Sequence, residues 1–515
     1  MNRLLTLSAT ELAKLIRERE VTSVEVVEAH IERIRSANPT LNAVVAERFQ
    51  DARAEAVAAD AQVRAGADAL GPFHGVPCTI KESFSMRGMP HTAGLVSRKG
   101  VIGTTDAPTV ARLKAAGAIP LGVTNVSELC FWIESNNRVY GRTNNPYNPR
   151  RTAGGSSGGE GAIVGAGGSP FGLASDVGGS IRMPAFFNGV FGHKPSGGMV
   201  PVSGQFPVPE AQGAPFLATG PIARHAVDLY PLLKTIAGPD AGDLSCEEFD
   251  LKDPSTVNLR GLEVVDVTDN GVFPISAELR AAQRRCADYL EAQGARVRRV
   301  KVDGLKRSID IWSSMITETT GTTFRSLLEN GQPIDLPSEF VTWARRRSPH
   351  TLPSLAVVCL ERLSRYDSNR NQRVVSLGNA LREELTDLIG PNGVMLFPSY
   401  ANAAPLHAAP LLIPIYIAYP AIFNVMQFPV TQVPLGLNAS GLPLGVQVAS
   451  IRGNDHLSIA VAIELERSMG GWVPPWTVQR APEQGSARKA FERSYSSGSR
   501  LWQAARNKRN AFFAD

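Results

Sequence analysis

Two consecutive glycines precede a serine in the segment 174–184, which reads ASDVGGSIRMP. Glycine has no Cβ, so the backbone amides around such a pair can converge on one point, as an oxyanion hole requires. Ser180 would then be a nucleophile that attacks a carbonyl carbon. The donors to the developing negative charge would be the amides of Val177, Gly178, Gly179 and Ser180 itself. Taken alone, the segment is equally typical of a glycine-rich turn with a surface serine.

A serine nucleophile without a histidine partner needs another base, and Lys81 is the candidate. A free lysine has a pKa of about 10.4, so only roughly one in a thousand is neutral at pH 7, and it must be buried to act as a base. Lys81 ends the apolar run Cys78-Thr79-Ile80, and in a strand its side chain would point away from that of Glu82. By itself, a lysine at a strand end is most often a solvated charge.

A second serine motif competes for the nucleophile. Residues 155–159 read GSSGG and match the short pattern GxSxG, which would nominate Ser157 and require a downstream acid and histidine. Such a short pattern often occurs by chance, and the neighbouring residues favour Ser180. The sequence contains no HExxH motif, no phosphate-binding loop and no histidines at metal-ligand spacing, so we expect neither a metal nor a cofactor.

The composition is that of a globular protein. Of its 515 residues 43% are hydrophobic and 20% charged, and the net charge of +5 is spread along the chain, which argues against a nucleic-acid surface. The five cysteines occur singly, which indicates neither a disulfide framework nor a zinc site and favours a reducing compartment. The N-terminus lacks the pattern of a secretory signal. We therefore expect a cytoplasmic protein.

The pattern along the chain predicts an α/β protein. Residues 8–66 show helical periodicity, and residues 75–126 and 261–302 each show the order strand, helix, strand. Residues 303–390 are expected to form a helical cover. The last segment, 476–515, is polar and basic, which fits a surface helix or a frayed tail.

Three segments together resemble the amidase signature family. They are GVPCTIKES (75–83), GGSSGGEGA (154–162) and SDVGGSIRMPAFFNGVFGHKPS (175–196), and their wording is most similar to the fatty-acid amide hydrolase branch. The resemblance extends over roughly residues 5–475. It implies an α/β fold with one large mixed β-sheet covered by helices on both faces. In that fold residues 1–70 would be a helical segment packed on a catalytic domain at 71–475.

The resemblance also implies a role for each matching residue. Ser180 is the nucleophile, Lys81 is the base, and Ser156 is a bridging serine, often in a cis peptide, that relays the proton between them. The positions that support this triad through hydrogen bonds are Ser157, Asp176 and Arg182. Cys130 and Phe131 match positions near the acyl chain of the substrate, although packing in the core explains them equally well.

We therefore expect a serine amidohydrolase that cleaves carboxylic amides, aryl or fatty acyl, through an acyl-enzyme. Its partner would be a small-molecule amide, without nucleic acid and with at most peripheral membrane contact, and the resemblance allows a homodimer. Two alternatives are the glutaminase subunit of a tRNA-dependent amidotransferase and a non-catalytic binding protein on the same fold. Hydrophobicity and position suggest further walls of an apolar acyl pocket, namely Trp312, Met315, Tyr416, Tyr419 and Phe423.

Overall fold

The computed structural model describes residues 2–67, 69–208, 212–319, 321–364 and 368–478. The predicted basic tail at 476–515 lies outside these residues beyond Val478. Within the described part of the chain, no helix has both the length and the apolar character that crossing a membrane requires.

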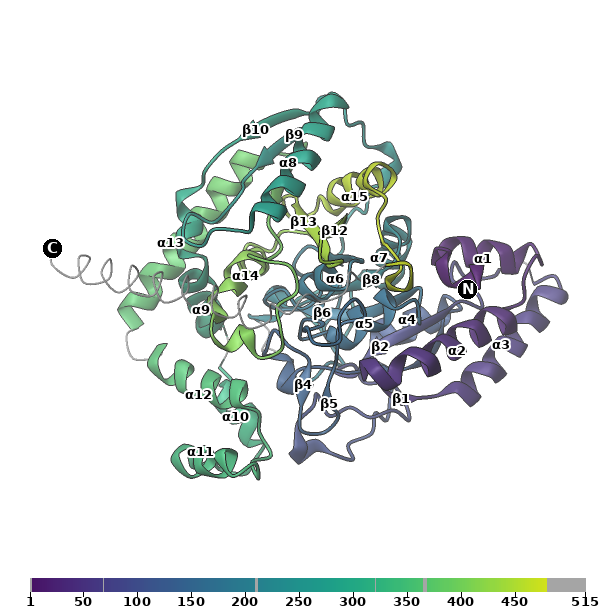
Figure 1. The fold of residues 1–515 in the computed structure, drawn as a ribbon, viewed down its shortest axis with the longest axis horizontal. Coiled ribbons are helices and arrows are strands. Elements are labelled where there is room, and N and C mark those ends of the chain that lie inside the picture. Colours follow the sequence, from purple (N-terminus) through teal and green to yellow (C-terminus); the bar gives the residue numbers. More distant parts are fainter. Residues whose placement is uncertain (1, 68, 209–211, 320, 365–367, 479–515) are drawn as a thin grey trace. The chain divides into compact units, whose positions relative to one another are not determined.

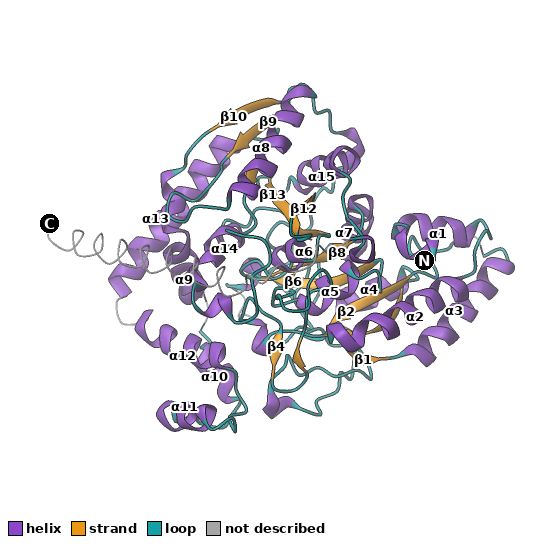
Figure 2. Ribbon diagram, in the orientation of Figure 1, coloured by secondary structure: helices purple, strands orange, loops and turns teal. Residues whose placement is uncertain are grey.

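An eleven-stranded mixed sheet forms the centre of the fold, with helices around it (Figures 1 and 2). The predicted fold class is thus confirmed. In spatial order the strands are β1 (Val44–Glu47), β3 (Ile119–Thr124), β2 (Pro77–Lys81), β6 (Phe171–Asp176), β8 (Ala218–Ala223), β7 (Phe191–Lys194), β12 (Val430–Leu437), β13 (Pro443–Ala449), β11 (Gly393–Phe397), β9 (Glu263–Asp266) and β10 (Arg296–Arg299). A separate short pair consists of β4 (Asn136–Asn137) and β5 (Gly141–Arg142).

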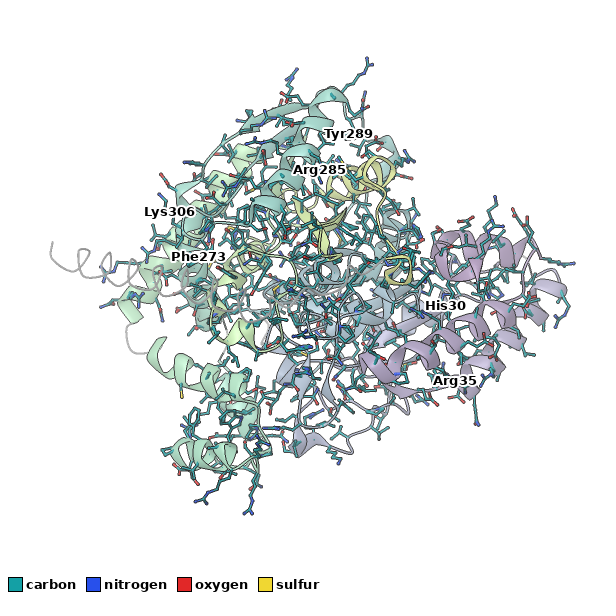
Figure 3. All side chains as sticks on the ribbon, viewed as in Figure 1. His30, Arg35, Phe273, Arg285, Tyr289 and Lys306 are labelled. Carbon is teal, nitrogen blue, oxygen red and sulfur yellow. The ribbon has the colours of Figure 1, made fainter. Side chains whose placement is uncertain are left out.

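The described residues also form α-helices. They are α1 (Ala9–Arg17), α2 (Ser23–Leu41), α3 (Phe49–Arg64), α4 (Pro108–Ala115), α5 (Gly158–Gly165), α6 (Arg182–Phe187), α7 (Leu229–Ile236), α8 (Ala277–Ala292), α9 (Ser308–Thr319), α10 (Phe324–Glu329), α11 (Leu336–Ala344), α12 (Leu352–Ser364), α13 (Ser368–Ile389), α14 (Ala418–Val425) and α15 (Asp455–Met469). Helix α2, with His30 and Arg35, lies at the β1 end of the sheet, and α8, with Arg285 and Tyr289, lies at the β10 end (Figure 3).

Both predicted strand-helix-strand units are present. Strands β2 and β3 are parallel neighbours joined through α4, and β9 and β10 are parallel neighbours joined through α8. Every residue of β2, β3 and β6 is buried, which explains why these strands appear in the sequence as continuous apolar runs rather than as alternating patterns.

The N-terminal segment differs from the all-helical prediction for residues 8–66. Val44–Glu47 forms β1, which pairs antiparallel with β3 at the edge of the main sheet. The β-branched pair Val44-Val45 suits a strand better than a helix, and the short strand gave too weak a signal between two longer helices. The helix before it, α2, begins with a complete capping box of Thr22 and Glu25.

The region predicted as a helical cover contains α9 to α13. Helix α9 packs against α13 and α14, close to the sheet. Helices α10, α11 and α12, here called the outer helices, lie together at one corner of the fold (Figure 1). Their apolar side chains form a small cluster of their own with Leu95 and Leu129 from the body of the protein.

Candidate active site

Two parallel strands bring the predicted base and its neighbours to one edge of the sheet. Strand β2 ends at Lys81 and β6 ends at Asp176, and the two strands pair through Thr79 and Gly172. The carboxyl ends of adjacent parallel strands are where α/β proteins place reacting groups. Turns that follow these strand ends therefore reach the same small volume.

Lys81 is fully buried and is held by two serines. Its Nζ donates to Ser156 Oγ at 2.8 Å and to Ser175 Oγ at 3.0 Å. The sequence did not single out Ser175, because its closeness to Lys81 follows from the pairing of β6 with β2 and not from any local motif. A base and a hydroxyl are therefore already in hydrogen-bonding contact in the interior.

The loops that carry Ser156 and Ser180 lie side by side. The Ser157 amide donates to the Ser180 carbonyl at 3.4 Å, and the Ser157 hydroxyl donates to the Ser175 carbonyl at 3.3 Å. The Gly155–Ser156 peptide bond is cis. Ser180 retains 7% of its surface against 0% for Lys81, so the predicted nucleophile is the more accessible of the two.

Asp176 organises the turn that leads into Ser180. Its Oδ1 accepts from the Gly179 amide at 2.6 Å and its Oδ2 accepts from the Ile181 amide at 3.0 Å. The Gly179 amide was predicted to join the oxyanion hole, but it is occupied by the carboxylate that lies three residues before it. Within the described residues, the amides of Val177, Gly178 and Ser180 have no hydrogen-bond acceptor, so these three stay available to an oxyanion.

A buried ion pair also holds the turn before Ser180 in place. Arg182 Nη2 lies 2.9 Å from Asp176 Oδ1, and both side chains are fully buried. Burial alone would raise the pKa of Asp176, but the charge of Arg182 and the hydrogen bonds to the carboxylate outweigh it and hold the pKa well below its usual range. The remaining Arg182 donors reach Pro420 O, Gln447 Oε1 and Asn424 Oδ1, each at 2.7 Å. Gln447 and Asn424 have no local signal in the sequence.

Burial also decides the charge of Lys81. It lowers the pKa of the amine, while Cys130, Asp176 and Glu160 oppose the shift. Of the two carboxylates, Asp176 is already paired with Arg182.

Glu160 supplies no counter-charge either. Burial raises its pKa to about 8, although hydrogen bonds from Thr79 and Thr124, at 2.6 and 2.9 Å, act against the shift. The acid is thus protonated at neutral pH. Neither carboxylate is therefore available as a counter-ion to Lys81, which favours the uncharged amine that a base must be.

Comparisons with known proteins agree with this geometry. A family model described as Amidase matches residues 25–458. The chain belongs to the amidase family. Fatty-acid amide hydrolase 2 of Homo sapiens is 44% identical, with 92% of this chain and 91% of that protein aligned. An acylamidase of Rhodococcus erythropolis is 30% identical, over 91% of this chain and 96% of that one.

Among solved structures, 6-aminohexanoate cyclic dimer hydrolase matches with a TM-score of 0.77 and 26% identity, covering 92% of this chain and 98% of that chain. As a member of the amidase family, the protein is a hydrolase that acts on amide carbon–nitrogen bonds. Within the described residues, no group of three or more His, Cys, Asp or Glu side chains is arranged to hold a metal ion.

Two of the residues singled out in the sequence, Cys130 and Trp312, lie beside the catalytic residues of this amidase, and Phe131 follows Cys130 in the chain. Cys130 is half-buried and interacts with Lys81. The Phe131 ring packs on Phe324 of α10, with ring centroids 4.9 Å apart. Trp312 Nε1 donates to Val177 O at 2.8 Å, and a Cβ added at Gly178 would come within 3.2 Å of the Trp312 ring.

The other predicted walls of the acyl pocket have different surroundings. Tyr419 and Phe423 are fully buried and pack against Phe397, while Met315 is 4% exposed. These three therefore pack in the core of the described structure, and their role in the wall of an acyl pocket stays a prediction. Tyr416 is half-buried and meets Tyr400 and Phe273 edge-on.

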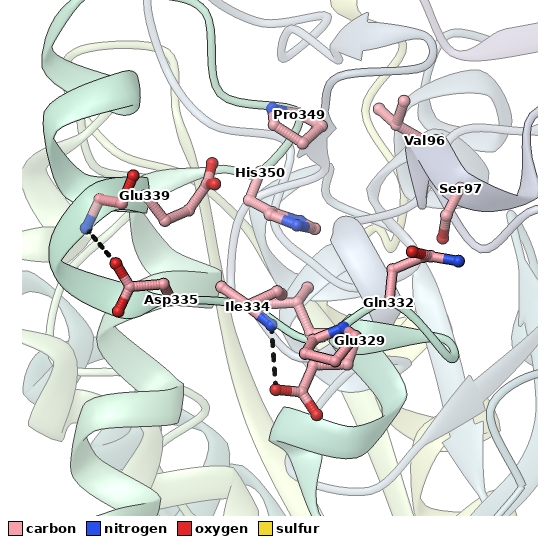
Figure 4. Close-up of a pocket in the computed structure, with 12 residues that line it drawn as sticks. Val96, Ser97, Glu329, Gln332, Ile334, Asp335, Glu339, Pro349 and His350 are labelled. Carbon is pink, nitrogen blue, oxygen red and sulfur yellow. Dashed lines mark hydrogen bonds between the residues drawn. The ribbon is translucent and has the colours of Figure 1, made fainter.

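A pocket of about 390 Å³ lies elsewhere, between the outer helices and the turn at Val96-Ser97 (Figure 4). Glu329, Asp335 and His350 are among the residues that line it. No predicted catalytic residue contributes to its walls, so this pocket is not the site of amide cleavage.

Proposed function

We propose that this amidase hydrolyses aryl or fatty acyl amides through an acyl-enzyme on Ser180, with Ser156 and Lys81 completing a Ser-Ser-Lys triad. The observation that carries the proposal is the fully buried Lys81 amine, which lies 2.8 Å from the Ser156 hydroxyl. Burial lowers the pKa of this amine and so favours the uncharged form that can act as a base, and the hydroxyl beside it is the group through which a proton can pass.

The proposed steps follow from this arrangement. The uncharged Lys81 amine takes the proton of the Ser156 hydroxyl as Ser156 takes that of Ser180, and Ser180 Oγ forms a bond to the carbonyl carbon. The amides of Val177, Gly178 and Ser180 stabilise the oxyanion. The proton then returns through Ser156 to the nitrogen as the C–N bond breaks, and the amine leaves. Water attacks the acyl-enzyme by the same route, which releases the acid and frees Ser180.

The substrate class rests on two kinds of support. The curated relatives include a fatty-acid amide hydrolase and an acylamidase. The side chains of Cys130, Phe131 and Trp312 make the surroundings of the catalytic loops apolar, which suits an acyl or aryl group more than the polar side chain of glutamine. A homodimer, peripheral membrane contact and a cytoplasmic location stay predictions.

The test is hydrolysis of acyl anilides and primary fatty amides of increasing chain length by the purified chain. We expect turnover by the wild type and a loss of at least about 1,000-fold in kcat for Ser180→Ala, because the nucleophile is gone. Ser203→Ala is the control, because the Ser203 hydroxyl donates to Asp240 and takes no part in the proposed relay, and it should retain most activity.

A fluorophosphonate identifies the nucleophile in the same samples. Peptide mapping should place the adduct on Ser180. Absence of both turnover and labelling would favour a non-catalytic binding protein, and hydrolysis of glutamine alone would favour the amidotransferase subunit. An adduct on Ser157 would contradict the assignment of the nucleophile.

A further inference from the structure

The turn η3 (Glu128–Cys130) lies between the catalytic serines and the outer helices. On its inner side, the Ser127 amide and the Ser135 hydroxyl both donate to the carbonyl of Ser156, at 3.3 and 2.9 Å. Its Leu129 and Cys130 have φ values of 53° and 61°, a left-handed conformation that non-glycine residues keep only when their surroundings hold it. The chain on either side of this turn therefore contacts the carbonyl of Ser156.

On its outer side, the turn presents a buried carboxylate to the outer helices. Glu128 is 1% exposed, and it accepts from His350 Nδ1 at 2.9 Å, the Thr351 amide at 2.8 Å and Ser354 Oγ at 2.8 Å. These donors flank the start of α12, where backbone amides have no partner within the helix. An acid from more than two hundred residues earlier in the chain thus acts as the cap of this helix.

The same turn contributes apolar contacts to the outer helices. Leu129 joins their hydrophobic cluster, and the next residues along the chain are Cys130, which interacts with Lys81, and Phe131, which packs on Phe324. Glu128 accepts the donors at the start of α12, and α10 packs against α12. The same short segment, residues 128–131, therefore lies beside the Lys81 amine and holds the outer helices.

We propose that Glu128 is a positioning residue. It docks the outer helices on η3 and thereby shapes the binding site for long acyl chains. The inference rests on the proposed function, because it assigns the acyl group to the side of Phe131. Loss of the Glu128 carboxylate releases α12, and the Phe131–Phe324 contact loosens with it. Short acyl groups, which do not reach that contact, are bound as before.

The experiment compares acetyl anilide with lauroyl anilide in the full chain. Glu128→Ala should raise KM for lauroyl anilide about tenfold and change kcat for acetyl anilide less than about threefold. Hydrogen exchange at the start of α12 should become faster in the same variant. Glu128→Gln keeps one acceptor oxygen and should fall between wild type and Glu128→Ala.

Asp335→Ala is the matched control. This variant lacks the acid that caps α11, in the same group of helices, and Asp335 has no contact with η3. The KM of the variant for lauroyl anilide should therefore stay near that of the wild type. Equal losses for the two anilides, or an unchanged KM for lauroyl anilide, would overturn the inference. If Glu128→Ala does not fold, Ser354→Ala removes one donor and carries the same expectation, reduced in size.

These outcomes are separate from a failure of the proposed function. A wild type that hydrolyses neither anilide and whose Ser180 is not labelled by a fluorophosphonate contradicts the function itself. An active wild type whose chain-length preference is insensitive to Glu128 contradicts only the role of Glu128.

Discussion

All eight residues of α5, the helix that follows Ser157, are buried, whereas none of the described residues of α11 is. Around α5, the polar side chains of Lys81, Asp176 and Arg182 have direct hydrogen-bond partners at 2.6 to 3.0 Å. Around α11, Val341 is 51% exposed. The difference teaches that catalytic geometry is fixed by a closed network of buried polar groups, while the outer helices are held by a few attachments.

The largest effect on stability should come from breaking the buried ion pair. Arg182→Ala leaves the Asp176 carboxylate buried without its partner. It also removes the hydrogen bonds that the guanidinium donates to Gln447 and Asn424. We expect a loss of about 3 to 5 kcal/mol in the free energy of unfolding, measured by urea denaturation. A loss below about 1 kcal/mol would show that this network does not differ from an ordinary surface contact.

Glu160 provides a pH-dependent test of the same region. Its pKa is raised from 4.5 to about 8 in the folded protein, so between these values the folded state binds one proton more than the unfolded state. Stability contributed by this group is therefore complete below about pH 4.5 and is lost as the pH rises through about 8.

Glu160→Gln removes that titration while it keeps the size of the side chain. The free energy of unfolding of the wild type relative to this variant should fall by about 2 kcal/mol between pH 6 and pH 8. Urea midpoints at the two pH values measure it. A constant difference would mean that the acid is ionised in the folded state and that Lys81 has a counter-ion after all.

The smallest effect should come from the outer helices. Val341→Ser replaces an exposed apolar side chain and should change the free energy of unfolding by no more than about 0.5 kcal/mol. Thermal unfolding of the variant beside the wild type tests this. A much larger loss would show that α11 is packed more firmly than its exposure indicates, and it would remove the contrast between the two regions.

The sequence indicates the residues proposed to react more clearly than the residues that hold them in place. Glycine spacing and an apolar strand end are local features that point to Ser180 and Lys81, and the family resemblance adds Ser156, which the structure brings into contact with Lys81. Ser175 and Gln447 are not found, because they meet the site only through the pairing of strands far apart in the chain.

The surroundings of two residues could not be predicted, for the same physical reason. The Gly179 amide looked free in the sequence but is taken by Asp176, and Tyr419, predicted as a pocket wall, packs in the core. Both depend on which partner is nearest in space. The fold class was predictable, since buried parallel strands separated by amphipathic helices leave a clear periodic signal, although the short edge strand β1 was missed.

The proton relay is tested most directly by the rate at which a fluorophosphonate labels Ser180, measured against pH in the wild type and in Lys81→Ala. Burial lowers the pKa of Lys81, so the wild type should label rapidly at pH 7 and slow as acid protonates the amine. Lys81→Ala should label about 100- to 10,000-fold more slowly at pH 7 and lose that dependence. Equal rates for the two proteins at pH 7 would contradict the relay.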